Sequence, residues 1–190
     1  MTRIIAGAAR GRRLAVPPGK RTRPTSDRAR EGLFGTLTAL RGTLQGARVL
    51  DLYAGSGAIG FEALSRGAWQ VVLIESDPAA VRVIRANLDA VALPGARVIT
   101  GQVSRVLAAG PAAGEAFDVV VADPPYAVAN DEVTAMLTAL AGGGWLAPGA
   151  VVAVERARRQ EPFSWPAGYE PDRSRTYGEA AFWYGLAASA

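Results

Sequence analysis

Asp123-Pro124-Pro125-Tyr126 combines residue types that can hold an amine, and it directly follows the apolar segment Phe117–Ala122. Ligands of open α/β sheets lie beyond the carboxyl ends of the strands, so this tetrapeptide is expected to face a ligand crevice. The two prolines fix the backbone and remove N–H donors, which favours outward-pointing acceptors. The Asp123 carboxylate and Pro124 carbonyl can then accept both N–H bonds of an exocyclic amine, and Tyr126 offers a stacking face for a base. The alternative is a simple Pro-Pro turn.

A glycine-rich segment lies earlier in the chain, with Gly55, Gly57 and Gly60 in the G-x-G-x-x-G pattern between a predicted strand and a predicted helix. Such glycines allow a tight turn and a close approach of the backbone to a ligand. Glu75 follows Gly55 by twenty residues and ends the next predicted strand, where it can accept hydrogen bonds from ribose hydroxyls. Together these residues predict an adenosine-containing cofactor.

Asp51 indicates which cofactor this is. It lies at the carboxyl end of the strand that precedes the glycine-rich segment, and we expect it to be ionised. A carboxylate there repels the pyrophosphate of a dinucleotide and attracts the ammonium and sulfonium groups of S-adenosylmethionine. The alternative for Asp51 is a turn or helix-capping role. An NAD-dependent oxidoreductase is disfavoured by Asp51 and by the lack of a histidine to serve as the hydride-transfer acid.

The composition excludes several kinds of chemistry. The 190 residues include neither cysteine nor histidine, so disulfides, thiol nucleophiles, thiolate metal sites and imidazole bases are ruled out, and we expect no metal. The hydrophobic fraction is 49%, which is typical of a globular domain, and no apolar run reaches the roughly 18 residues of a membrane span. The short apolar piece near the amino terminus does not resemble a signal peptide, so we expect a cytoplasmic protein.

Positive charge is concentrated at the amino terminus. Residues 1–30 contain nine basic residues and one acidic residue, a net charge of +8, whereas the rest of the chain carries −4. A basic arm on a mildly acidic body favours a polyanionic partner, most naturally a nucleic acid. The alternative is a solvated basic tail, because 20 of the 21 basic residues in the whole chain are arginines.

The apolar pattern predicts an α/β fold with a doubly wound, mostly parallel sheet. Nearly continuous apolar runs, typical of strands covered on both faces, alternate with helix-like segments. The predicted strands are 48–52, 70–74, 96–100, 117–122 and 150–154, and the predicted helices are 58–66, 78–92, 103–109 and 131–141. An antiparallel hairpin over 173–177 and 181–185 is expected to close the sheet.

The segment before residue 43 is expected to be a small extension of this domain. Residues 3–6 and 13–16 predict a β-hairpin, and Ser26 is a good N-cap for a helix that ends near Gly42. The predicted organisation is therefore a basic hairpin-and-helix extension over 1–42 and a catalytic domain over 43–190.

These motifs together resemble the class I S-adenosylmethionine-dependent methyltransferases that carry a (D/N)PP(Y/F) motif. More narrowly, the chain resembles the RsmD family, which methylates guanine N2 in 16S ribosomal RNA. The family-specific pieces lie in the arm, over Arg3–Gly7, Arg10–Leu14 and Arg23–Glu31. Further matching pieces are Asp51–Gly60, Leu64–Ala68, Ile74-Glu75, Asn87-Leu88 and Asp123–Tyr126, so the resemblance covers nearly the whole chain.

The resemblance implies a role for each matching position. It assigns Asp123, Pro124, Pro125 and Tyr126 to catalysis, and it assigns the methionine end of the cofactor to Asp51, Tyr53, Gly55, Ser56 and Gly57. It assigns the ribose to Glu75 and the adenine to Gln102 and Val103. At the position of Gln102, similar enzymes often have Asp. It implies 16S rRNA as the partner, within an assembled or assembling 30S subunit, contacted through Arg10, Arg12, Arg13, Arg23, Thr25 and Arg28.

Other functions fit parts of the same pattern. A DNA adenine-N6 methyltransferase uses the same tetrapeptide, but the chain has no obvious insertion large enough for a DNA target-recognition domain. A protein-glutamine methyltransferase resembles the Asn form of the motif and does not call for a basic arm. A non-catalytic RNA-binding assembly factor on a methyltransferase fold is disfavoured because Asp51, Glu75 and the tetrapeptide are intact.

Overall fold

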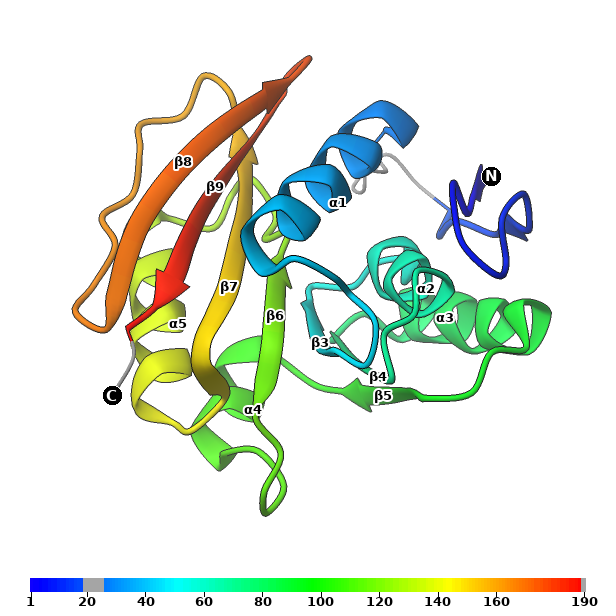
Figure 1. Cartoon of the computed structure of the whole chain (residues 1–190), viewed down its shortest axis with the longest axis horizontal. Coiled ribbons are helices and arrows are strands. Elements are labelled where there is room, and N and C mark those ends of the chain that lie inside the picture. Colours follow the sequence, from blue (N-terminus) through cyan, green and yellow to red (C-terminus); the bar gives the residue numbers. More distant parts are fainter. Residues whose placement is uncertain (19–25, 189–190) are drawn as a thin grey trace.

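The structure, a computed structural model, describes residues 1–18 and 26–188. A seven-stranded sheet forms its centre, in the order β5-β4-β3-β6-β7-β9-β8 (Figure 1). The strands are β3 (Arg48–Leu52), β4 (Gln70–Glu75), β5 (Ala96–Thr100), β6 (Phe117–Ala122), β7 (Leu146–Ala157), β8 (Tyr169–Tyr177) and β9 (Ala180–Ala187). Strands β3 to β7 are parallel to one another, whereas β9 is antiparallel to both β7 and β8. The predicted fold class is confirmed.

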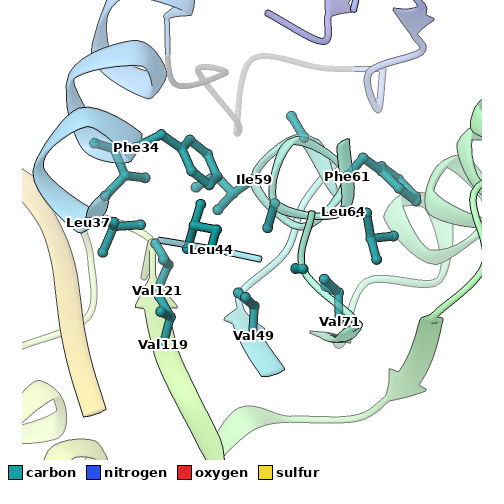
Figure 2. Close-up of a cluster of buried hydrophobic side chains, with 14 of the residues drawn as sticks. Phe34, Leu37, Leu44, Val49, Ile59, Phe61, Leu64, Val71, Val119 and Val121 are labelled. Carbon is teal, nitrogen blue, oxygen red and sulfur yellow. The ribbon is translucent and has the colours of Figure 1, made fainter. Parts of the chain in front are cut away.

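Helices cover both faces of the sheet, as the continuous apolar strands predicted. They are α1 (Asp27–Arg41), α2 (Ala58–Ser65), α3 (Pro78–Val91), α4 (Val103–Ala109) and α5 (Asn130–Gly142). Helices α1, α2 and α3 pack on one face through one buried cluster, and α4 and α5 pack on the other through a second. Figure 2 shows part of the first cluster, formed by Phe34, Leu37, Leu44, Val49, Ile59, Phe61, Leu64, Val71, Val119 and Val121.

The predicted amino-terminal hairpin forms, but its strands are shorter than expected. Only β1 (Thr2–Arg3) and β2 (Arg13–Leu14) pair with one another. The N–H groups of Ile5 and Ala6 instead donate hydrogen bonds to the carboxylate of Glu62 on α2, at 2.7 and 3.0 Å. These backbone donors bond to the body of the protein rather than to the facing strand, so the ladder ends early.

The amino-terminal arm, residues 1–18, is packed onto the body of the molecule. Ile4, Ala9 and Leu14 are buried in the same cluster as α1 and α2. Helix α1 starts as predicted, since the Ser26 hydroxyl accepts a hydrogen bond from the Ala29 N–H. Among the residues described, no helix is long and apolar enough to cross a membrane.

Candidate active site at the carboxyl ends of β3 and β6

The glycine-rich loop and the tetrapeptide leave the sheet side by side. Strands β3 and β6 are parallel neighbours in which Leu52 lies opposite Ala122. The next residue after β6, Asp123, donates its N–H to the Leu52 carbonyl at 3.2 Å. Two segments about seventy residues apart in the chain therefore meet at one edge of the sheet, as the position of ligands in open α/β sheets predicted.

The loop after β3 has an unusual backbone that holds it open toward this edge. Tyr53 is half-buried and has a φ of 60°, a conformation that costs a non-glycine residue free energy and is concentrated at functional sites. Gly57 has a φ of 75° and is the N-cap of α2. A Cβ at Gly55 would meet nothing closer than the Tyr53 carbonyl oxygen at 4.0 Å, so a ligand can approach the backbone there.

Gly60 serves packing rather than ligand approach. A Cβ at this position would lie 2.9 Å from side-chain carbons of both Leu73 and Val71, and 3.2 Å from a carboxyl oxygen of Asp51. The absence of a side chain lets α2 lie close against β3 and β4. Of the three glycines in the motif, Gly55 and Gly57 therefore shape the loop and Gly60 seats the helix.

Asp51 is 1% exposed, and its Oδ2 accepts a hydrogen bond from the Gly60 N–H at 2.9 Å. Burial raises the pKa of Asp51 to about 8, the Gly60 bond opposes this shift, and the nearby Glu75 adds to it. Burial therefore works against the expected ionisation of Asp51 in the ligand-free protein, because it disfavours the charged form. The turn role considered for Asp51 is present in the structure, while its contact with a cofactor remains a prediction.

Glu75 ties the end of β4 to the glycine-rich loop. Its Oε2 accepts the Gly55 N–H at 2.8 Å, and its Oε1 accepts the N–H groups of Ser76 and Asp77 at 2.7 and 2.8 Å. A carboxylate offers about four lone-pair sites, so one remains after these three bonds. Glu75 therefore fixes the loop and can still accept a hydroxyl donor, as its predicted ribose contact requires.

Gln102 and Val103 lie where β5 passes into α4. Gln102 is exposed at the N-cap of α4, and Val103 is buried. Gln102 lines a cavity of about 820 Å³ together with Ser76 and Gly101. Of the two predicted adenine-binding residues, Gln102 therefore borders a space that also reaches Ser76, the residue after Glu75, whereas Val103 does not line it.

The tetrapeptide forms a turn that reaches the surface. Asp123 is half-buried and Pro124 is buried, whereas Pro125 and Tyr126 are exposed, with 46% of Tyr126 accessible. The Pro125 carbonyl accepts the Val128 N–H at 2.8 Å, and the Tyr126 carbonyl accepts Nε2 of Gln160 at 2.8 Å. The aromatic ring is thus presented at the surface on a backbone held by hydrogen bonds.

Arg156, near the carboxyl end of β7, is a site residue that the sequence interpretation missed. It is 2% exposed, and its Nη2 donates to the Val128 carbonyl at 2.7 Å and to Oδ1 of Asn130 at 3.2 Å. Its Nε and Nη1 have no hydrogen-bond partner in the described part of the chain. Burial lowers the pKa of Arg156 and raises that of Tyr53, while charge interaction between the two opposes both shifts. The only signal in the sequence was an arginine ending an apolar strand.

Four of the six predicted RNA contacts lie at the surface, three on the arm and Arg28 on α1. Arg10, Arg12, Arg13 and Arg28 are exposed, although Arg12 also donates through Nη1 to the Val91 carbonyl at the end of α3. Arg23 and Thr25, also predicted to contact RNA, lie outside the described residues.

Not all of the positive charge counted over residues 1–30 is available to a partner. Arg30 is 1% exposed and donates to Oδ1 of Asp27 and to the Arg3 carbonyl, at 2.8 and 2.7 Å. Its guanidinium therefore joins α1 to the arm and does not face solvent.

Three polar side chains of α2 and α3 hold the arm in place. Glu62 is fully buried and accepts from two arm N–H groups, and Ser65 accepts from the Ala9 N–H at 2.9 Å. Asn87 exchanges hydrogen bonds with both backbone groups of Ala15 and also donates to the Ser56 carbonyl at 2.9 Å. Asn87 therefore connects the arm to the glycine-rich loop, a role that its position in the sequence did not reveal.

Within residues 1–18 and 26–188, no group of three or more His, Cys, Asp or Glu side chains could hold a metal ion. Two acidic residues of the site, Asp51 and Glu75, accept hydrogen bonds from backbone N–H groups.

Known proteins resemble this chain over nearly its whole length. The family model described as "Conserved hypothetical protein 95" matches residues 2–185. Ribosomal RNA small subunit methyltransferase D of Escherichia coli (strain K12) is 38% identical over 180 residues, covering 95% of this chain and 87% of the relative. The Haemophilus influenzae protein of the same name is 34% identical over 181 residues, covering 95% and 91%. A solved structure from Thermus thermophilus, described as a hypothetical protein, superposes with a TM-score of 0.80 at 35% identity and covers all of both chains.

The match to the family model and to these relatives extends from the arm, through the glycine-rich loop and the tetrapeptide, to the last strand, and on that basis the chain belongs to the RsmD family.

Proposed function

We propose that this protein transfers a methyl group from S-adenosylmethionine to the exocyclic N2 amine of a guanine in the 16S rRNA of the small ribosomal subunit. The main support for this proposal is that the glycine-rich loop and the tetrapeptide lie side by side at the carboxyl ends of β3 and β6. The Asp123 N–H donates a hydrogen bond to the Leu52 carbonyl there. The names of the relatives support ribosomal RNA of the small subunit as the substrate class.

The residues at this edge fit S-adenosylmethionine better than a dinucleotide. Two carboxyl groups, of Asp51 and Glu75, border the loop, and the backbone at Gly55 is open to a ligand. A cation nearby favours the ionised form of a buried carboxyl, whereas a phosphate disfavours it. Asp51 and Tyr53 through Gly57 would hold the methionine end, Glu75 the ribose, and Gln102 with Val103 the adenine. When bound, the cofactor supplies the methyl group.

The tetrapeptide would position the amine. A guanine amine is a weak nucleophile because its lone pair is delocalised into the ring, and two acceptors on its hydrogens favour the pyramidal form. The half-buried Asp123 carboxylate and the Pro124 carbonyl follow one another on a backbone fixed by two prolines, which suits this task. Attack places positive charge on the nitrogen, and the Asp123 carboxylate stabilises that charge and can accept the proton. Tyr126, with 46% of its surface accessible, offers the stacking face.

The experiment is methyl transfer from labelled S-adenosylmethionine to 16S rRNA, 30S subunits, DNA and protein in parallel, followed by nucleoside analysis. We expect labelled N2-methylguanosine from RNA or subunits alone. Label in N6-methyladenine of DNA would instead establish a DNA adenine-N6 methyltransferase. No transfer to any substrate, together with RNA binding, would favour the non-catalytic assembly factor.

Asp123→Ala tests the role of the tetrapeptide in the same assay. We expect the single-turnover rate to fall by at least about 10²-fold, because the variant loses an acceptor and a stabilising charge where positive charge develops. Cofactor affinity, measured by calorimetry, should stay nearly unchanged. Tyr126→Phe is the matched mild variant, since it keeps the ring and should retain most of the rate. Near-normal transfer by Asp123→Ala would place the amine site elsewhere.

A further inference from the structure

A groove of about 590 Å³ adjoins the tetrapeptide on the side away from the arm. It is lined by Tyr126, Ala157, Arg158, Arg159, Gly178 and Glu179, and we call it the Arg158–Arg159 groove. None of these residues except Tyr126 was singled out in the sequence. The groove therefore joins the one exposed aromatic ring of the tetrapeptide to two exposed arginines at the end of β7.

The walls of this groove are fixed by hydrogen bonds between three separate segments. Gln160 donates through Nε2 to the Tyr126 carbonyl at 2.8 Å and accepts the Ala157 N–H on Oε1 at 3.0 Å. The Arg158 N–H donates to the Glu179 carbonyl in the β8–β9 turn at 2.7 Å. The end of β7 is thus tied to the tetrapeptide on one side and to the β8–β9 turn on the other, which gives both arginines a defined backbone position.

The position of the groove relative to the arm suggests a path across the site. The arm packs on α2 and α3, through Glu62, Ser65 and Asn87, on the β3–β4–β5 side of the sheet. The groove is lined by residues that end or follow β7 and by residues in the β8–β9 turn. Strands β7, β9 and β8 lie on the other side of β6 from β3, β4 and β5 (Figure 1). The carboxyl ends of β3 and β6 lie between these two parts of the sheet, so the tetrapeptide lies on a path that an RNA strand touching both basic regions can take.

We propose that the Arg158–Arg159 groove binds the phosphodiester backbone of the substrate RNA next to the nucleotide held by the tetrapeptide, a subsite that rests on the proposed function. A guanidinium presents paired N–H donors that match phosphate oxygens, and two of them outnumber the single carboxylate in the lining, Glu179. Phosphate contacts set the register of a bound strand. Because Tyr126 lines the groove, a strand held there places the adjoining base beside the stacking ring.

The test is the variant Arg158→Gln/Arg159→Gln, with binding of a fluorescent single-stranded RNA oligonucleotide measured over a series of salt concentrations. We expect weaker binding and a salt slope lower by about 0.7 for each phosphate that the variant no longer neutralises, up to about 1.4 for both. Arg158→Lys/Arg159→Lys should keep the slope and lose part of the affinity, because lysine retains the charge without the paired donors. Affinity for S-adenosylmethionine should not change in either variant.

Arg173→Gln/Arg175→Gln is the matched control, since it removes two exposed charges from β8 outside the groove. An equal loss of slope in this control, or an unchanged slope in the groove variant, would overturn the subsite. Methyl transfer by the wild-type protein separates this outcome from the proposed function. If the wild-type protein methylates RNA and the groove variant binds RNA with an unchanged salt slope, only the proposed subsite is wrong. If the groove variant binds RNA less well but the wild-type protein transfers no methyl group, only the proposed activity is wrong.

Discussion

Asp51 illustrates how one buried residue can carry two roles at different pH values. In the ligand-free protein it bonds the Gly60 N–H at the start of α2, and burial raises its pKa to about 8. A cationic ligand near it favours ionisation, so binding and proton release become linked. We therefore propose that the carboxyl holds the loop when protonated and attracts the donor when ionised.

This linkage predicts a pH-dependent donor affinity. Below its pKa Asp51 must lose a proton before it can attract a cation, so affinity for S-adenosylmethionine should rise between about pH 6 and pH 8 by up to about tenfold per unit. Asp51→Asn keeps an acceptor for Gly60 and should flatten this dependence. Calorimetry of both proteins in buffers of different ionisation enthalpy measures the affinity and the proton released. The same slope in both proteins would separate Asp51 from the donor.

The raised pKa of Asp51 also makes the free energy of unfolding depend on pH. The folded protein holds the Asp51 proton more tightly than the unfolded chain, whose carboxyl has the ordinary pKa of 3.8. This contribution to the free energy of unfolding is full below about pH 4 and is lost as pH rises through about 8. Thermal midpoints of wild type should therefore fall more over about pH 5 to 8 than those of Asp51→Asn.

At the scale of elements, the arm presents its arginines from a fixed position. Its backbone bonds to Glu62, Ser65 and Asn87, and Ile4 and Leu14 are buried beneath it. Rigid placement lowers the entropy lost when the exposed arginines bind a partner. The arm thus combines a structural attachment with a basic surface.

Replacing Arg10, Arg12 and Arg13 together by Gln should weaken RNA binding and flatten its salt dependence by about 0.7–0.9 for each phosphate that is no longer neutralised. Donor affinity should not change, because these side chains are exposed and lie on the arm. Since Arg12 also bonds the Val91 carbonyl, the Arg10→Gln/Arg13→Gln pair serves as the matched variant that leaves this bond in place. If both variants show the same salt slope as the wild type, these arginines do not contact RNA phosphates and are only solvated surface residues.

Asn87 joins two elements, so its loss should affect both. Asn87→Ala leaves the Ala15 N–H and the carbonyls of Ala15 and Ser56 without this partner, and we expect a loss of about 1–3 kcal/mol in the free energy of unfolding. Donor affinity should fall several-fold, because the loop at Ser56 loses a support. Denaturant unfolding and calorimetry measure the two effects.

Ser65→Ala is the control for Asn87, since Ser65 bonds the arm at Ala6 and Ala9 but has no bond to the glycine-rich loop within the described residues. It should destabilise the arm and leave donor affinity close to that of wild type. Equal donor affinity in Asn87→Ala and wild type would show that the bond to Ser56 does not support the cofactor loop.

At the scale of the whole molecule, the arm, α1 and the sheet share one buried cluster. Ile4 is 1% exposed and belongs to the same cluster as Phe34, Val49 and Val121. The division into a segment over 1–42 and a domain over 43–190 stays a prediction from the sequence, and the buried cluster includes residues from both parts. We therefore expect the chain to unfold as one cooperative unit.

Ile4→Ala tests this cooperativity. The cavity left in the cluster should lower the free energy of unfolding by about 2–5 kcal/mol. All four tryptophans, Trp69, Trp145, Trp165 and Trp183, lie outside the arm, so their fluorescence reports on the body of the protein. The fluorescence and circular-dichroism transitions should shift together. An unchanged fluorescence midpoint would mean that the arm unfolds separately.

The sequence by itself predicted the fold class, nearly all the helices and strands, the glycine-rich loop and the tetrapeptide. These features are local: apolar periodicity, glycines at a turn and a carboxylate at a strand end depend on neighbouring residues. Topology then places the two motifs together, because parallel strands end at the same edge of a sheet.

Only the tertiary structure decided the raised pKa of Asp51, the burial of Arg30 and Arg156, the bridge through Asn87 and the groove at Arg158 and Arg159. A pKa depends on the solvent removed by distant segments, as α2 does over Asp51. A hydrogen bond such as that between Asn87 and Ala15 joins residues 72 positions apart, and nothing in the residue types along either segment specifies the partner. Long-range packing sets solvent access and partners, whereas local sequence sets the elements that carry them.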